Sequence, residues 1–155
     1  MLDQFSNFHI KVKSSIEITL TTLHIGEYRR AVTLGINGKD PAKLFLEKLR
    51  KDDSQKWERL AVRIENVSNH HTYENDQIFN YIEDGIYEFK RPGLRLYAFY
   101  DEIGEEHQLI LCTNGGKKNN KREQQTDIKR AKRIKADYLA AKSSKAARFV
   151  IKENS

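Results

Sequence analysis

The clearest alternation of apolar and polar positions lies between residues 85 and 118. Three runs rich in aromatic and aliphatic side chains, 86–90, 94–100 and 108–113, are separated by residues typical of turns. Short alternating runs with turn residues between them predict three strands of an antiparallel meander. Charged side chains inside these runs are therefore expected to gather on particular faces of the sheet.

The turn after the first run decides which charges meet. Either a two-residue loop at Pro92-Gly93 or a four-residue loop places Lys90 opposite Arg95. The two-residue loop also places Glu88 opposite Tyr97, and all four side chains then share one face, because side chains alternate along a strand. Like charges directly opposite cost up to about 1 kcal/mol. This face is thus either a place for an anion or a solvated face on which Glu88 neutralises the pair.

The residues before the meander predict strands followed by helices. Alternating segments at 8–12, 16–25 and 28–36 predict two or three half-buried strands. Asp40-Pro41 is typical of a helix start, with Asp as the N-cap and Pro in the first turn. That helix is expected to run to about residue 51.

A second helix is expected from Ser54 to Ser68, because its apolar residues recur at helical spacing. The short connection between the two helices predicts an antiparallel pair that covers one face of the sheet. The segment 78–82 is expected to form a short turn beneath the sheet. After the meander we expect a basic loop over 114–120, whose two glycines and two lysines would let backbone and ammonium groups approach a phosphate closely. A helix is expected over 121–145.

The positive charge is concentrated near the end of the chain. The whole sequence has a formal charge of +6, but residues 117–155 alone carry +9. Such a basic segment is expected of a surface for nucleic acid or an acidic protein, or of a solubilising helix with a basic tail.

Other features exclude several classes of protein. At 155 residues the chain fits one domain. The single cysteine, Cys112, cannot form an intrachain disulfide and suits packing in a reducing cytoplasm. The sequence shows no signal peptide and no apolar stretch long enough for a membrane span. The adjacent His70 and His71 lack further ligand spacing, so no metal site is expected.

Several short motifs occur in a recognisable order. They are the strand Gly85–Lys90, the segment Leu94-Arg95-Leu96, the run Gly116-Lys117-Lys118, and Ala131 and Tyr138 on the last helix. Over roughly residues 41–142 this order resembles the RelE/HigB superfamily of toxins from type II toxin–antitoxin systems, especially its phage-derived HigB-like branch.

The resemblance implies an α+β fold in which two helices pack on a twisted antiparallel sheet. Residues 1–40 would form an N-terminal β extension, 41–145 the RelE/HigB-like core with a basic C-terminal helix, and 146–155 a flexible tail. Active members of the family are metal-independent endoribonucleases that cleave mRNA, usually on the ribosome. The implied partners are a cognate antitoxin, mRNA and, as for ribosome-dependent relatives, the ribosome. The resemblance implies no cofactor, no membrane and a location in the cytoplasm.

The resemblance also indicates site residues. Lys90, Arg95 and either Lys117 or Lys118 match basic positions of the family, and the HigB-like branch commonly has Glu at position 88. In a metal-free reaction the RNA 2′-hydroxyl attacks the adjacent phosphate. Glu88 would serve as base, the cations would stabilise developing charge, and Tyr97 would donate a proton or stack a base.

Six further cations are expected to contact RNA. They are Arg91, Lys121, Arg122, Lys129, Arg130 and Arg133. The alternative is a non-catalytic binding protein of the RelE/ParE fold, either a topoisomerase poison or a phage-derived module that binds nucleic acid or a partner. The acidic Glu88 and the absence of a clear match for the terminal catalytic tyrosine of some relatives favour that alternative.

Overall fold

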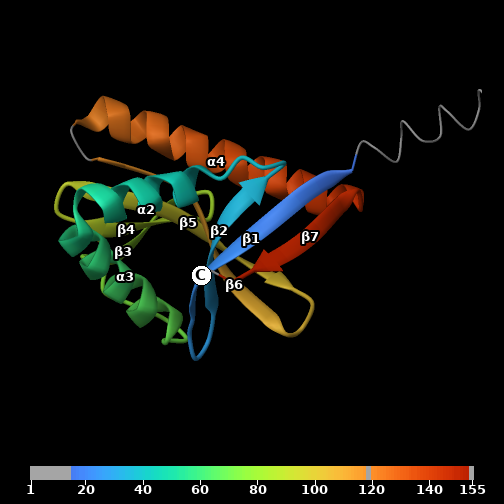
Figure 1. Ribbon diagram of the computed structural model, residues 1–155, viewed down its shortest axis with the longest axis horizontal. Coiled ribbons are helices and arrows are strands. Elements are labelled where there is room, and N and C mark those ends of the chain that lie inside the picture. The colour runs from blue at the N-terminus through green and yellow to red at the C-terminus, as the bar shows by residue number, and fades with distance from the viewer. Residues whose placement is uncertain (1–14, 118–119, 154–155) are drawn as a thin grey trace, which may run out of the picture.

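The computed structural model describes residues 15–117 and 120–153. The predicted strand at 8–12 and Lys118 therefore lie outside the described residues. The described chain consists of strands and helices packed around one sheet (Figure 1). Their order is β1 (Ile16–Ile25), β2 (Arg30–Ile36), α2 (Pro41–Asp52), α3 (Ser54–Ser68), β3 (Phe79–Glu83), β4 (Ile86–Arg91), β5 (Leu94–Ile103), β6 (His107–Lys117), α4 (Lys121–Ser144) and β7 (Ala147–Lys152).

The strands form one mixed sheet in the order β3-β4-β5-β6-β2-β1-β7. The β2–β6 and β1–β7 pairs are parallel, and the other neighbouring pairs are antiparallel. The predicted α+β class is confirmed, but the expectation of a purely antiparallel sheet was wrong. The N-terminal strands join the same sheet as the meander, because β2 pairs with β6 along Arg30–Thr33.

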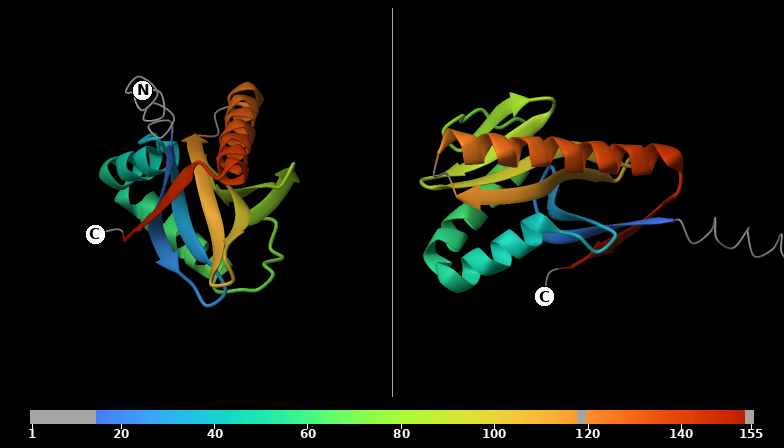
Figure 2. Two further views of the ribbon diagram at one scale, coloured as in Figure 1. Left: turned by 90° about the vertical axis from the view of Figure 1, so that its right-hand side faces the viewer. Right: turned by 90° about the horizontal axis from the view of Figure 1, so that it is seen from above.

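Helices cover both faces of this sheet (Figure 2). On β5, Leu96 and Ala98 pack with the apolar residues of α2 and α3. The alternate residues Tyr97 and Phe99 pack with Ala131, Tyr138 and Ala141 of α4. A sheet buried on both faces needs apolar side chains on both sides, which explains the long buried run of β5.

Capping residues set the starts of α2 and α3, and the Asp40 cap of α2 was predicted. Asp40 caps α2 by accepting from the Lys43 backbone N–H at 3.0 Å, and Pro41 occupies the first turn. Asp53 ends α2 and caps α3 through the Lys56 N–H at 3.2 Å. With one residue between them, the helices meet in an open V instead of the expected antiparallel pair (Figures 1 and 2).

The segment 78–82 was expected to form a turn, and this was wrong for most of it. Residues Phe79–Glu83 form the edge strand β3, which pairs with β4. The connection is Asp84-Gly85, with φ of 52° and 77°. Two positive φ values are typical of a type I′ hairpin turn, for which Asp-Gly is a strong sequence signal.

The expected flexible tail at 146–155 was also wrong over its described part. Lys145 turns the chain out of α4 with a left-handed φ of 60°. Residues Ala147–Lys152 then form β7, parallel to β1, and Arg148 Nη2 lies 2.8 Å from Glu17 Oε2. Phe149 is half-buried against Tyr138, with ring centroids 6.1 Å apart. This edge strand therefore anchors the end of the helix to the sheet.

Candidate functional site

The predicted register of the meander is confirmed. Lys90 pairs with Arg95, and Glu88 pairs with Tyr97, across a two-residue turn at Pro92-Gly93. Leu94 and Leu96 pack on the α2/α3 side, so the four polar side chains belong to the α4 side. The sequence therefore brings Glu88, Lys90, Arg95 and Tyr97 to one face of two neighbouring strands.

Glu88 and Arg95 form a buried ion pair on this face. The Arg95 Nε atom lies 3.0 Å from Glu88 Oε1, and the two residues are only 7% and 5% exposed. Arg95 Nη1 also donates to the backbone oxygens of Leu94 at 2.7 Å and Arg91 at 3.1 Å. The sequence left two alternatives for this face, an anion site or a solvated face on which Glu88 neutralises the cations. In the structure Glu88 does neutralise Arg95, but the pair is buried within the fold.

Two side-chain amides donate hydrogen bonds to the Glu88 carboxylate. Asn80 Nδ2 donates to Oε2 at 3.1 Å from the neighbouring strand β3, and Gln124 Nε2 of α4 lies 3.5 Å from Oε1. Sequence reasoning missed both residues. The Asp84-Gly85 signal would have indicated this hairpin, but a plain two-residue turn places Asn80 opposite Phe89. The irregularity between Tyr81 and Glu83 shifts the register by one residue, so that Asn80 pairs with Glu88.

The first turns of α4 cover this face. Tyr97 is fully buried there, and burial, followed by the negative charges of Asp127 and Glu88, raises the pKa of its hydroxyl. Asn114 of β6 fixes the helix by donating to the Asp127 backbone oxygen at 3.0 Å. In this arrangement Tyr97 is neutral and shielded from solvent at ordinary pH.

The remaining predicted catalytic cations lie around the rim of this covered face. Lys90 is half-buried, and its Nζ donates to the Asp76 backbone oxygen at 3.2 Å. Lys117 lines a surface hollow with Arg122 and Thr126 at the start of α4. Among the described residues, Lys90, Arg95 and Lys117 thus do not surround one open spot.

The predicted phosphate-binding loop at 114–120 is a strand up to Lys117, and its glycines serve packing. Gly115 pairs with Leu96 and faces α2, where an added Cβ would lie 2.3 Å from the Phe45 ring. Gly116 pairs with Arg95 and faces α4, where a Cβ would lie 2.3 Å from Asp127 Oδ2. Adjacent glycines therefore let two helices approach opposite sides of one strand.

Alanine at position 115 is expected to lower the free energy of unfolding by about 1–3 kcal/mol, because overpacking forces a core ring to move. Gly116→Ala is the matched comparison and is expected to cost less, since the Asp127 carboxylate is the end of a flexible side chain. Urea unfolding of both variants measures the difference. Equal losses would contradict the packing explanation.

A row of cations follows the solvent side of α4. Arg122, Lys129 and Arg133 are exposed and lie on one side of the helix, at spacings of seven and four residues. Lys121 and Arg130 are exposed beside this row. None of these five predicted RNA-binding residues forms an ion pair within the described ranges.

Other cations of α4 have structural partners. Lys132 Nζ lies 2.8 Å from Glu83 and 3.2 Å from Asp84, and Lys142 Nζ lies 2.8 Å from Asp101. These pairs attach the helix to the sheet. The predicted RNA-binding residue Arg91 is elsewhere, on the α2/α3 side of β4, because it pairs with Leu94.

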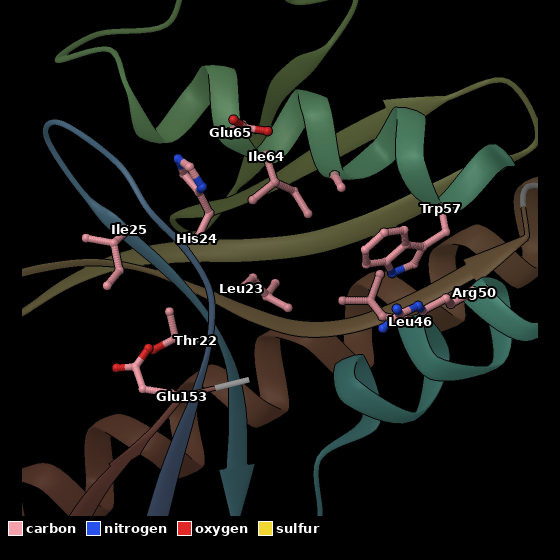
Figure 3. A pocket seen from close by; sticks show the side chains of 11 residues that line it. Thr22, Leu23, His24, Ile25, Leu46, Arg50, Trp57, Ile64, Glu65 and Glu153 are labelled. Atoms are coloured by element: carbon pink, nitrogen blue, oxygen red, sulfur yellow. The ribbon is translucent and has the colours of Figure 1, made fainter. Parts of the chain in front are cut away.

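A cavity of about 460 Å³ lies away from this face, between β1 and the α2–α3 pair (Figure 3). Leu23, Ile64 and Trp57 line it, and the Arg50 guanidinium lies 5.0 Å from the Trp57 ring centroid. His24 Nε2 is buried beside it without a hydrogen-bond partner among the described residues. Sequence analysis identified none of these residues as a site.

The described cysteine and histidine side chains do not form a metal-binding group. Cys112 is buried in the core, and burial raises the pKa of its thiol, as expected for a packing residue. Across residues 15–117 and 120–153, no group of three or more His, Cys, Asp or Glu side chains suits a metal ion. Within the same ranges, no helix has the length and apolar character needed to cross a membrane.

Similarity to known proteins does not identify the chain. Comparison with protein-family models gave no match, and comparisons with curated proteins and with solved structures gave no significant match.

Proposed function

We propose that this protein is an RNA-directed toxin of the RelE/HigB type and that it holds RNA on the solvent side of α4. The observation that carries the proposal is the row Arg122, Lys129 and Arg133, whose charges are exposed and unpaired within the described chain. A line of exposed cations can pair with the regularly spaced phosphates of a nucleic-acid strand.

The geometry of the row suits a nucleic-acid backbone. A rise of 1.5 Å per residue separates the three Cα atoms along the helix by about 10 Å and 6 Å. Binding of phosphates releases condensed counterions, which favours association at low salt. Because the row carries no aromatic side chain for base stacking, we expect contact with the backbone and little preference for base sequence. A cognate antitoxin that silences the protein would cover this row.

Cleavage of mRNA is a second proposal, favoured by the meeting of Glu88, Arg95 and Tyr97 on one face. In that reaction Glu88 would take the proton of the RNA 2′-hydroxyl, Arg95 would stabilise the charge on phosphorus, and Tyr97 would protonate the leaving oxygen. The same three residues lie beneath α4, so RNA reaches them only if the first turns of the helix move. Burial therefore favours binding over cleavage in the arrangement described.

One assay separates these possibilities. The purified protein is incubated at low salt with an end-labelled single-stranded mRNA fragment in EDTA, and both retention and product ends are measured. Retention together with 2′,3′-cyclic phosphate ends supports the nuclease, and retention of intact RNA supports the non-catalytic toxin. Absence of both overturns the RNA proposal.

The structure also identifies the better variant for the nuclease test. Arg95→Ala removes a buried ion pair and endangers the fold, whereas Lys90 is half-buried and donates only to a backbone oxygen. Under the nuclease proposal, Lys90→Ala is expected to slow cleavage by about 10²–10³-fold, as for loss of one stabilising donor. Exposed Lys51, in the last turn of α2, is the control, and its change to alanine is expected to keep full activity.

A further inference from the structure

Two arginines meet on the side of the sheet opposite α4. Arg91 is two residues after Phe89 on β4 and therefore points toward α3, where Arg63 lies. Arg63 Nη1 donates to the Lys90 backbone oxygen, which holds its guanidinium against the strand beside Arg91. The positive charge of Arg91 is close enough to Arg63 to contribute, after burial, to a lowered pKa of its guanidinium.

Neither guanidinium has an acidic partner. No ion pair to Arg63 or Arg91 occurs within residues 15–117 and 120–153, and Arg91 Nε is buried without a hydrogen-bond acceptor there. Burial, followed by Arg91, lowers the pKa of Arg63, whereas Tyr73 raises it. The exposed Arg59 lies one turn earlier on the same side of α3.

A pair of partly buried like charges is unfavourable unless an anion neutralises it. Glu88 neutralises Arg95 on the other side of the sheet, whereas no carboxylate of the described residues forms an ion pair with Arg63 or Arg91. The two neighbouring guanidinium groups are also held by different elements, Arg63 by the helix α3 and Arg91 by the strand β4. This combination is characteristic of a ligand site and differs from a single flexible surface cation.

We propose that Arg63 and Arg91 form a binding site for a phosphate group. A phosphate monoester carries about −1.5 to −2 charges at pH 7 and so neutralises both guanidinium groups. Its tetrahedral oxygens can accept from two planar forks at once, including the Arg91 Nε–H group that has no acceptor among the described residues. The site lies on the face away from the α4 row and does not depend on the RNA proposal.

Inorganic phosphate is the first probe, used with the whole chain. We expect phosphate to raise the melting temperature more than chloride at the same ionic strength, because binding to the native state stabilises it. Arg63→Gln combined with Arg91→Gln is expected to weaken phosphate binding at least tenfold. Arg148→Gln removes a guanidinium from exposed β7 and is expected to leave phosphate binding unchanged.

If the double variant does not fold, the single variant Arg91→Gln serves as the test. It is expected to show most of the loss in phosphate binding. Undiminished phosphate stabilisation in folded Arg91→Gln overturns the site. A pair of oligoribonucleotides with and without a 5′-phosphate then identifies the source. Tighter binding of the phosphorylated form, lost in Arg91→Gln, supports an RNA end, and equal binding with retained phosphate stabilisation supports a small phosphate ligand.

Discussion

Replacement of Glu88 by alanine is expected to lower the free energy of unfolding by about 3–5 kcal/mol. The substitution leaves Arg95 buried with a charge that no carboxylate neutralises, because only two backbone oxygens remain as its partners. It also removes the acceptor of the Asn80 amide. Burial of an uncompensated charge is among the largest single-residue penalties in a folded domain.

Urea unfolding at neutral pH measures this loss. The control is the double variant Glu88→Leu with Arg95→Met, which removes both charges and is expected to recover much of the stability. A loss below about 1 kcal/mol in Glu88→Ala would show that the ion pair is solvated and would contradict the covered arrangement. Such a small loss would instead favour a solvent-exposed catalytic face, because an exposed ion pair contributes little to stability.

The meander could be predicted from the sequence because several local signals agree there. Pro92-Gly93 separates two alternating runs, and alternation then fixes that Glu88, Arg95 and Tyr97 share a side. Likewise, Asp40-Pro41 marks the start of α2 through its cap. Each of these signals acts over a few residues, so no knowledge of distant contacts is needed.

The accessibility of the polar face could not be predicted in the same way. Alternation assigns Glu88 and Arg95 to a face but does not reveal that a helix about thirty residues later covers it, as the Gln124 contact shows. The glycines at 115 and 116 looked suited to a phosphate, whereas they admit Phe45 and Asp127. A glycine is needed both where another element approaches the backbone closely and where a ligand does, so the sequence alone does not distinguish the two.

Two edge strands were missed for a different reason. β3 is short, and its Asp84-Gly85 turn was read only as the beginning of the next strand. The segment Ala147–Lys152 alternates weakly and follows a basic helix, so a mobile tail was expected. Its partner β1 is more than one hundred residues earlier, and parallel pairing at that separation has no local signature.

Neutralising the row on α4 is expected to weaken RNA binding about 10- to 100-fold at low salt. The variant combines Arg122→Gln, Lys129→Gln and Arg133→Gln. Each exposed contact with a phosphate contributes about 0.5–1 kcal/mol, and three such contacts give that range. Because all three side chains are in solvent, the melting temperature is expected to change little.

A charge-matched control separates local contacts from the effect of net charge. Lys48→Gln, Lys51→Gln and Lys56→Gln remove the same three charges from exposed positions on α2 and α3. Long-range attraction alone predicts equal losses in both variants, whereas a binding row on α4 predicts a much smaller loss in the control.

The dependence of RNA affinity on salt tests the row most directly. For single-stranded RNA the logarithm of the binding constant falls by about 0.7 per phosphate contact for each tenfold rise in salt. The α4 variant is therefore expected to have a slope shallower than that of the unmodified protein by about 2, with the control variant close to the unmodified protein. Equal slopes for the α4 variant and the unmodified protein would contradict the proposal that this row holds RNA.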